Sequence, residues 1–134
     1  MTLAQAEFQP PFADWLGMKI THVSADRVTG ELPMREELNN RFGIMHGGAL
    51  MAFADNLGGT ATIANLPEGV TTTTIESKTN FFAAIPTGET AYGECTPLHR
   101  GRTTQVWQTK ITRADGRLAA LVTQTQLVLA GKPK

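Results

Sequence analysis

The chain carries no excess charge of either sign, because 12 basic side chains balance 12 acidic ones. A basic excess is typical of proteins that bind nucleic acid or acidic membranes, so neither partner is expected. A lone cysteine, Cys95, excludes an internal disulfide and fits a reducing compartment. No apolar run is long enough to span a bilayer, and the N-terminus lacks the basic and then apolar pattern of a signal peptide. These absences predict a soluble cytoplasmic protein.

At 134 residues the chain is expected to fold as one domain over residues 1–134. A chain of this length can bury about two thirds of its unfolded surface. No internal repeat and no low-complexity tract divides it. Residues 1–9 are interpreted as a loose N-terminal arm, and residues 131–134 (GKPK) as a solvated C-terminal tail.

The order of predicted elements indicates an α+β fold. A short helix is expected in PPFADWLG, followed by a hairpin over residues 18–34 and a long helix over residues 47–64. Four β-rich segments follow: VTTTTIESKTNFF, GETAYGECTPL, TTQVWQTKIT and LAALVTQTQLVLA. Two strands, one long helix and four strands predict a mainly antiparallel sheet packed on a helix.

The long helix carries a single formal charge, Asp55, in the middle of its sequence. One face bears a continuous apolar stripe: Leu50, Phe53, Ala54, Leu57, Ala61 and Ala64. The opposite face groups small residues around the carboxylate: Gly48, Ala52, Asp55, Gly59 and Thr62. The apolar stripe is expected to pack on the chain's own sheet. Since little of the chain remains to cover the small-residue face, a partner subunit is expected there.

The start of this helix offers a second chemical group. The first N–H groups of a helix have no intrahelical partner and carry the positive end of the dipole, and glycines let a ligand approach them closely. His46-Gly47-Gly48 could therefore form an oxyanion hole. Asp55 lies about 12 Å from Gly47 along the axis, at about 1.5 Å per residue. If both groups act on one carbonyl, they must come from two subunits.

Other interpretations of these residues remain open. His-Gly-Gly can be a hinge with His46 as a helix cap, and Asp55 can be a structural acid bonded to a threonine or an amide. A metal site is not expected, because the three histidines and Asp55 lack ligand-like spacing. A serine or cysteine nucleophile is not expected either, since no G-x-S-x-G is present and Cys95 lies in an alternating strand.

The pattern N-x(5)-H-G-G-x(6)-D resembles the hotdog-fold acyl-CoA thioesterases, in particular the branch of the phenylacetate-pathway and 4-hydroxybenzoyl-CoA enzymes. Here it is met by Asn40, His46, Gly47, Gly48 and Asp55. The later runs TNFFAAIPTGE and PLHRGRTTQVWQ are also similar to that family. The resemblance implies a hotdog fold, in which a curved antiparallel sheet wraps around one long central helix and two subunits join their sheets edge to edge.

The resemblance also implies roles for individual residues at a site shared by two subunits. The N–H of Gly47 would polarise the thioester carbonyl, while Asn40 and His46 would orient the thioester or the attacking water. Asp55 of the partner would act as nucleophile or general base, and the sequence does not choose between these roles. Thr74 falls where some relatives place a water-positioning hydroxyl.

The expected activity is therefore hydrolysis of an aryl- or medium-chain acyl-CoA, with no cofactor because CoA is part of the substrate. Arg100 and Arg102 of HRGR are candidates to bind the CoA phosphates, although a solvated turn is an equal alternative. The expected assembly is a homodimer that pairs into a homotetramer. The alternative function is a non-catalytic acyl-CoA sensor of the same fold. A hydratase of this fold is disfavoured, because in those enzymes the acid precedes the histidine.

Overall fold

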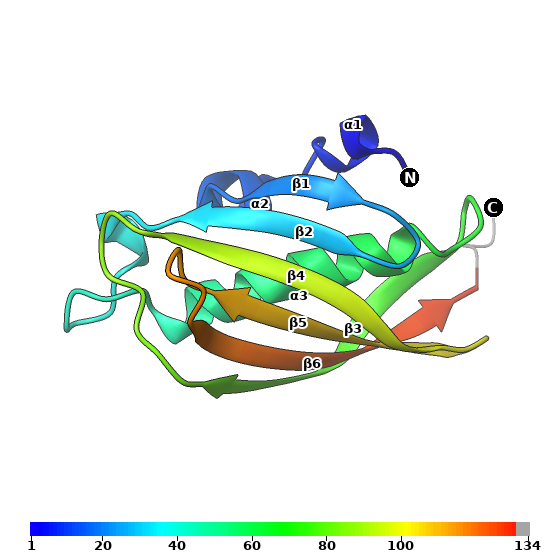
Figure 1. The fold of residues 1–134 in the computed structure, drawn as a ribbon. Coiled ribbons are helices and arrows are strands. Elements are labelled where there is room, and N and C mark those ends of the chain that lie inside the picture. The colour runs from blue at the N-terminus through cyan, green and yellow to red at the C-terminus, as the bar shows by residue number, and fades with distance from the viewer. Residues whose placement is uncertain (131–134) are drawn as a thin grey trace.

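The computed structural model describes residues 1–130, in which a six-stranded sheet curves around one long helix (Figure 1). The strand order is β1-β2-β4-β5-β6-β3, and every neighbouring pair is antiparallel. The strands are β1 (Lys19–Val23), β2 (Val28–Pro33), β3 (Thr71–Phe81), β4 (Thr90–Arg100), β5 (Thr104–Thr112) and β6 (Leu118–Leu129). The helices are α1 (Leu3–Ala6), α2 (Pro11–Leu16) and α3 (Gly47–Ile63), with a 3-10 turn η1 (Glu36–Leu38). The predicted α+β hotdog architecture is confirmed.

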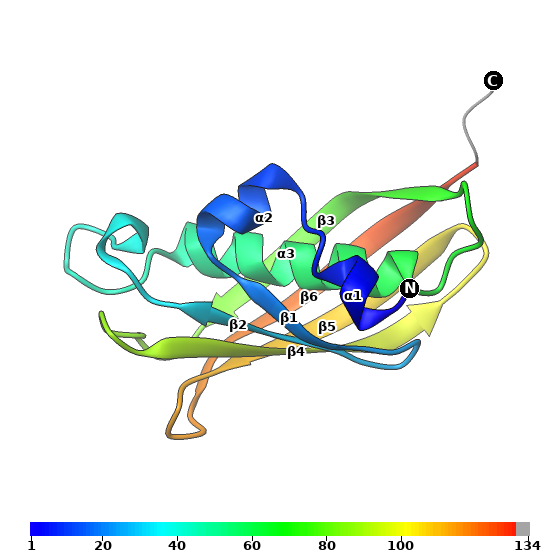
Figure 2. The same cartoon turned by 90° about the horizontal axis from the view of Figure 1, so that it is seen from above.

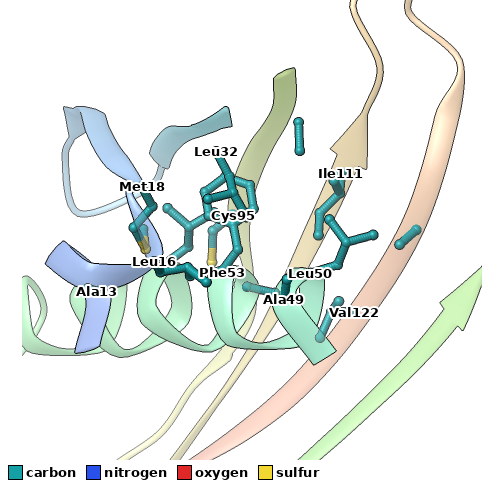
Figure 3. Packing of buried hydrophobic residues seen from close by; sticks show 14 of the residues in the cluster. Ala13, Leu16, Met18, Leu32, Ala49, Leu50, Phe53, Cys95, Ile111 and Val122 are labelled. Atoms are coloured by element: carbon teal, nitrogen blue, oxygen red, sulfur yellow. The ribbon is translucent and has the colours of Figure 1, made fainter. Parts of the chain in front are cut away.

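The core lies between α3 and the concave face of the sheet, and Figure 2 shows α3 lying along that face. Leu50, Phe53, Ala54, Leu57 and Ala61 of the predicted apolar stripe are buried, and Ala64 is half-buried. Figure 3 shows Leu50 and Phe53 pointing from α3 toward the strands. The helix approaches β4 so closely that a Cβ at Gly93 would lie 2.5 Å from Leu57 Cδ1. Burial of these side chains stabilises the fold by about 1.5–3 kcal/mol for each large one.

The short elements follow the local sequence signals. Proline begins α2, and Gly17 ends it in a left-handed conformation with φ 86°. The expected hairpin is formed by β1 and β2. No helix within residues 1–130 is long and apolar enough to cross a membrane.

Two predicted boundaries are wrong. Residues 1–9 are not a loose arm throughout, because α1 forms there with a capping box between Thr2 and Gln5, and Ala6 is buried in the core. The break expected at HRGR begins only at Gly101, since β4 continues through His99 and Arg100. The predicted tail over residues 131–134 lies outside the described residues.

Strand β3 forms one edge of the sheet and contains a bulge between Thr74 and Glu76. An extra residue at a bulge shifts the alternation of side chains by one position. Thr72 and Thr74 before the bulge, and Ser77 and Thr79 after it, are therefore the half-buried positions of β3, whereas Ile75 is exposed. The bulge thus keeps a row of hydroxyl groups beside α3.

Candidate active site

Helix α3 begins with a cap that leaves one backbone donor free. His46 is the N-cap, and its Nδ1 accepts a hydrogen bond of 2.8 Å from the N–H of Gly48. Because Nδ1 accepts, the neutral imidazole carries its proton on Nε2. The N–H of Gly47 finds no acceptor within residues 1–130. The donor predicted for the oxyanion hole is therefore available, while its neighbour is occupied by the cap.

Asn40 organises the loop that leads into this helix. Its Oδ1 accepts hydrogen bonds from the N–H groups of Phe42 at 2.8 Å and Ile44 at 3.4 Å. The backbone of Asn40 is also paired with Ile44, at 2.8 Å. With Oδ1 engaged in this turn, the side-chain Nδ2 is the group of Asn40 left to meet a ligand.

Asn40 and Gly47 line the same cavity, of about 310 Å³, whose apolar wall includes Phe81 and Phe82. The Phe81 ring lies directly against the helix start, since a Cβ at Gly47 would be 3.0 Å from Phe81 Cζ. Both rings are exposed in the single chain, at 51% for Phe81 and 56% for Phe82, so they give this site one apolar side and do not enclose it. His46 does not line this cavity. It faces a separate one of about 200 Å³ beside Phe12 and Trp15 of α2.

Asp55 lies on the solvent-exposed side of α3, where β3 and β6 contribute two donors to one of its oxygens. The hydroxyl of Thr74 donates to Asp55 Oδ1 at 2.6 Å, and Gln124 Nε2 donates to the same atom at 3.3 Å. The other oxygen, Oδ2, has no hydrogen-bond partner within residues 1–130. The carboxylate is thus held at one oxygen and open at the other, and the open oxygen can attack or accept a proton.

The cavity beside Asp55 is distinct from the cavity at the helix start. It measures about 390 Å³ and is lined by Asp55 and Thr74 together with Met1 and Phe8 of the N-terminal segment. Neither Asn40 nor Gly47 borders it. Within one chain the structure therefore brings Asp55 together with Thr74, and Asn40 together with Gly47, but does not join the two pairs.

The small-residue face of α3 is only partly open, because α2 and the N-terminal segment border it. Gly48 and Asp55 are exposed, and Ala52 and Gly59 are half-buried. Thr62 departs from the expectation, because it is fully buried and its hydroxyl donates to the Gly58 carbonyl at 2.8 Å. A threonine can satisfy its hydroxyl on the preceding helical turn, so it needs no partner at the surface.

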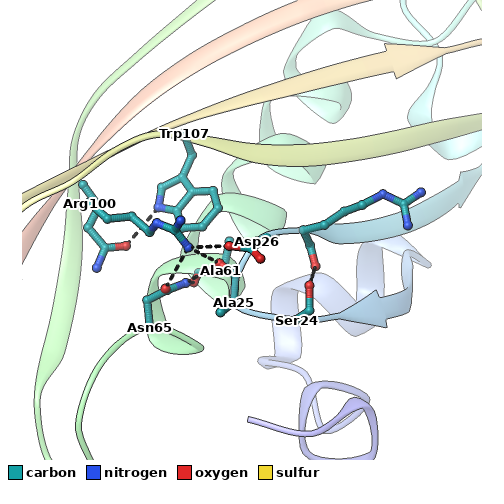
Figure 4. A network of polar contacts seen from close by, with 9 residues as sticks. Ser24, Ala25, Asp26, Ala61, Asn65, Arg100 and Trp107 are labelled. Carbon is teal, nitrogen blue, oxygen red and sulfur yellow. Dashed lines mark hydrogen bonds and ion pairs between the residues drawn. The ribbon is translucent and has the colours of Figure 1, made fainter.

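Arg100 is held within the chain by a polar network (Figure 4). Its Nη1 forms an ion pair with Asp26 Oδ1 at 2.8 Å. The same Nη1 donates hydrogen bonds to the Ala25 carbonyl at 2.9 Å and to Asn65 Oδ1 at 3.4 Å. These contacts join the β1–β2 turn, the end of α3 and the end of β4. Arg102 is exposed and is free of such contacts within residues 1–130. Of the two arginines, Arg102 is therefore the one with a guanidinium group free to bind a phosphate.

Two other groups bear on the chemistry available to the chain. Cys95 is fully buried, and burial raises the pKa of its thiol to about 11, although Thr109, its neighbour on the paired strand β5, lowers the pKa in part. A thiol that stays protonated at neutral pH is a poor nucleophile. Within residues 1–130 no group of three or more His, Cys, Asp or Glu side chains is placed to hold a metal ion.

The sequence interpretation missed the glutamines of β6. Gln124 is fully buried and reaches Asp55, and Gln126 Nε2 donates to the Thr74 hydroxyl at 2.6 Å. The available signal was the polar alternation in LVTQTQLVL, which puts two glutamines on the same face as Val122. Alternation alone does not say which face of the strand is buried. The sequence therefore could not show whether the two glutamines face the core or the solvent.

The comparisons with known proteins agree on one family. The sequence model of the thioesterase superfamily matches residues 42–120, which is more than half of the chain. The proofreading thioesterase EntH of Klebsiella pneumoniae is 32% identical over 102 residues, covering 76% of this chain and 74% of that protein.

Solved structures give the same result. The thioesterase HI1161 of Haemophilus influenzae superposes with a TM-score of 0.89 at 26% identity, covering 96% of this chain and 91% of that one. A hypothetical thioesterase protein with coenzyme A, from Streptococcus pneumoniae, superposes with a TM-score of 0.78 at 25% identity, covering 87% and 88% of the two chains. The chain belongs to the thioesterase superfamily, and it is a thioester hydrolase of the hotdog fold.

Proposed function

We propose that this chain hydrolyses an aryl- or medium-chain acyl-CoA to the free acid and CoA, with Asp55 as the catalytic carboxylate and the Gly47 N–H as the oxyanion donor. One observation carries the proposal. An unengaged N–H at the start of α3 and a carboxylate with one free oxygen lie on the same helix, each beside its own cavity. These are the two groups that hydrolysis of an activated ester requires.

The site is proposed to be shared by two subunits. Gly47 and Asp55 are eight residues apart on one helix, or about 12 Å along its axis at about 1.5 Å per residue. That separation is too large for both to act on one carbonyl, and the two residues border different cavities. A two-fold dimer would bring Asp55 of one subunit to Gly47 of the other. The exposed part of α3 around Gly48 and Asp55, together with the edge strand β3, is a surface suited to such a dimer, and two dimers would pair into a tetramer.

The chemistry needs no group beyond these residues and water. As general base, Asp55 Oδ2 takes a proton from water while the water oxygen bonds to the thioester carbon, and the carbonyl oxygen becomes an oxyanion at the Gly47 N–H. The C–S bond then breaks, the proton passes to the sulfur, and acid and CoA are released. As nucleophile, Oδ2 bonds to the carbon instead, CoA leaves, and water hydrolyses the resulting anhydride. Asn40 Nδ2, which borders the Gly47 cavity, is the proposed orienting donor, and His46 Nε2, which faces the separate cavity beside α2, is the second candidate.

Arg102 is proposed to bind the phosphates of CoA, with Arg100 as the second candidate. A coenzyme A molecule accompanies the related Streptococcus pneumoniae protein, which supports a CoA thioester as the substrate class. No cofactor is assigned, since the thioester is already activated and CoA leaves as product. A substrate of this kind and the lone buried Cys95 favour a cytoplasmic enzyme.

The test is thiol release from a panel of acyl-CoAs: benzoyl, phenylacetyl, hydroxybenzoyl and straight-chain. Asp55→Ala should lower kcat by at least about 10²-fold on the best substrate, the range for loss of a general base. Glu68→Ala is the matched control, because Glu68 is an exposed acid beyond the end of α3. Turnover by Asp55→Ala at the wild-type rate would refute the assignment. Saturable acyl-CoA binding without turnover by the wild type would instead indicate the sensor.

A further inference from the structure

We infer that Gln124, a buried glutamine of β6, is a positioning residue that fixes the Asp55 carboxylate for catalysis. The inference rests on the proposed function, in which Asp55 is the catalytic carboxylate. Gln124 Nε2 donates to Asp55 Oδ1 at 3.3 Å, and Gln124 has no exposed surface. It therefore acts on the reaction through Asp55, from inside the core.

The position of Gln124 is unfavourable for stability alone. It lies on the core face of β6 two residues from the fully buried Val122, opposite the fully buried Trp107 of β5. Its Oε1 is buried and has no hydrogen-bond partner within residues 1–130. A buried polar atom without a partner is costly, whereas an apolar side chain of the same length would carry no such cost. A glutamine that is half satisfied in a core indicates a role other than packing.

Helix α3 is shaped to admit this side chain. Gly58 lies in its interior, where glycine is unfavourable for a helix. A Cβ at Gly58 would collide with the Gln124 amide group, so only glycine leaves the room that the amide occupies. Two features therefore lower the stability of the core: the glycine inside α3 and the unpaired Oε1 of Gln124. Both are needed to place the Gln124 N–H group against Asp55.

A relay of hydrogen bonds supports the same oxygen from β3. Gln126 Nε2 donates to Thr74 Oγ1 at 2.6 Å, and the Thr74 hydroxyl donates to Asp55 Oδ1 at 2.6 Å. Gln126 Oε1 in turn lies 3.0 Å from the hydroxyl of Thr72. Since Thr74 accepts from Gln126, its own proton is directed to the carboxylate. Gln124 is the second donor, and two donors on Oδ1 fix the rotation of the carboxylate and leave Oδ2 facing out.

The decisive variant is Gln124→Met, which keeps the length of the side chain and removes the donor. We expect kcat to fall about 10- to 100-fold, in line with the effect of a small misplacement of a reacting group. KM should stay within twofold, and the melting temperature should be equal to or above that of the wild type. Gln108→Met, on the outward face of β5, is the matched control and should leave all three quantities unchanged.

A second variant keeps the test valid if Gln124→Met folds poorly. Gln124→Asn retains an amide but withdraws it by one carbon from Asp55, and it should lose kcat in the same way. In the Asp55→Ala background, Gln124→Met should cause no further loss, because it acts only through that carboxylate. Wild-type kcat in Gln124→Met or Gln124→Asn, beside an inactive Asp55→Ala, would overturn the positioning role alone. Full activity of Asp55→Ala would overturn the proposed function as well.

Discussion

The hydroxyl of Thr74 donates a hydrogen bond of 2.6 Å to Asp55 Oδ1, joining the edge strand to the central helix across 19 residues of sequence. Thr74→Val keeps the shape of the side chain and removes this donor. A hydrogen bond to a charged group contributes about 1.5–3 kcal/mol. We therefore expect kcat to fall by roughly tenfold or more, at about 1.4 kcal/mol per factor of ten.

Thr74→Ser is the control for this substitution, because it retains the hydroxyl and should keep kcat within roughly threefold of the wild type. Steady-state kinetics on one acyl-CoA distinguish the two variants. Equal rates in Thr74→Val and Thr74→Ser would show that the hydrogen bond has no part in turnover.

The oxyanion donor at Gly47 can be removed without breaking the helix. Gly47 is the first residue of α3, where proline is favoured, and His46 already has the extended conformation that precedes proline, with φ −63° and ψ 135°. Gly47→Pro deletes the N–H and should lower kcat about 10²- to 10³-fold. Gly47→Ala introduces the same Cβ against Phe81 but keeps the N–H, so it separates crowding from loss of the donor. A Gly47→Pro enzyme as active as Gly47→Ala would contradict the assignment.

The shared site predicts complementation between two inactive chains. In a mixed dimer of Asp55→Ala and Gly47→Pro, one site receives both substitutions and the other receives neither. Random pairing of equal amounts should then restore about a quarter of the wild-type rate, since half of the dimers are mixed and each has one intact site. The measurement is thiol release after co-expression or co-refolding. If activity remains at the level of the separate variants, both groups act within one chain.

Cys95 should be inert in the native protein. Its pKa is raised to about 11 by burial, against 9.0 for an unperturbed thiol, so almost no thiolate is present near pH 7. A colorimetric thiol reagent should find no reactive thiol in the folded chain and one per chain in denaturant. The enzyme itself will then add no background to assays of CoA release. Rapid reaction of the folded chain would show that this part of the core opens.

The same group makes stability depend on alkaline pH. The unfolded thiol ionises above about pH 9, while the folded one stays neutral until about pH 11. The contribution of the buried, neutral thiol to the free energy of unfolding is therefore complete below pH 9 and is lost as pH rises to 11. Urea unfolding of wild type and Cys95→Ala across this range should show a steeper decline for the wild type. Parallel declines would assign the alkaline loss to other groups.

The two arginines near the β4–β5 turn are expected to differ. Arg100→Met should lower the free energy of unfolding by about 1 kcal/mol or less, because its ion pair with Asp26 is partly exposed. Arg102→Met should leave stability unchanged and raise KM for an acyl-CoA but not for an N-acetylcysteamine thioester, which lacks the nucleotide phosphates. Thermal unfolding and kinetics on both substrates check this. An equal KM change on both thioesters would exclude phosphate binding.

Much of the fold could be predicted from local sequence signals. The apolar stripe Leu50, Phe53 and Leu57 predicted α3, and proline followed by Gly17 predicted the bounds of α2. The N-terminal segment could not be predicted in this way, because a four-residue helix is stabilised by its cap and by Ala6 in the core rather than by its own pattern. The bulge at Ile75 could not be predicted either. A bulge is recognised by a break in the alternation of polar and apolar residues, and a run of threonines shows no such alternation.

By itself, the sequence determined which chemical groups the chain can use. A helix begins at His46-Gly47-Gly48 and carries one carboxylate two turns later. Both features follow from residues that are close together in the sequence. Only the tertiary structure decided the surroundings of that carboxylate. Thr74 and Gln124 reach Asp55 from strands that are 19 and 69 residues away in sequence. Such contacts depend on the register of each strand and on which of its faces is buried. Both are set by the packing of the complete core and not by the sequence of one strand.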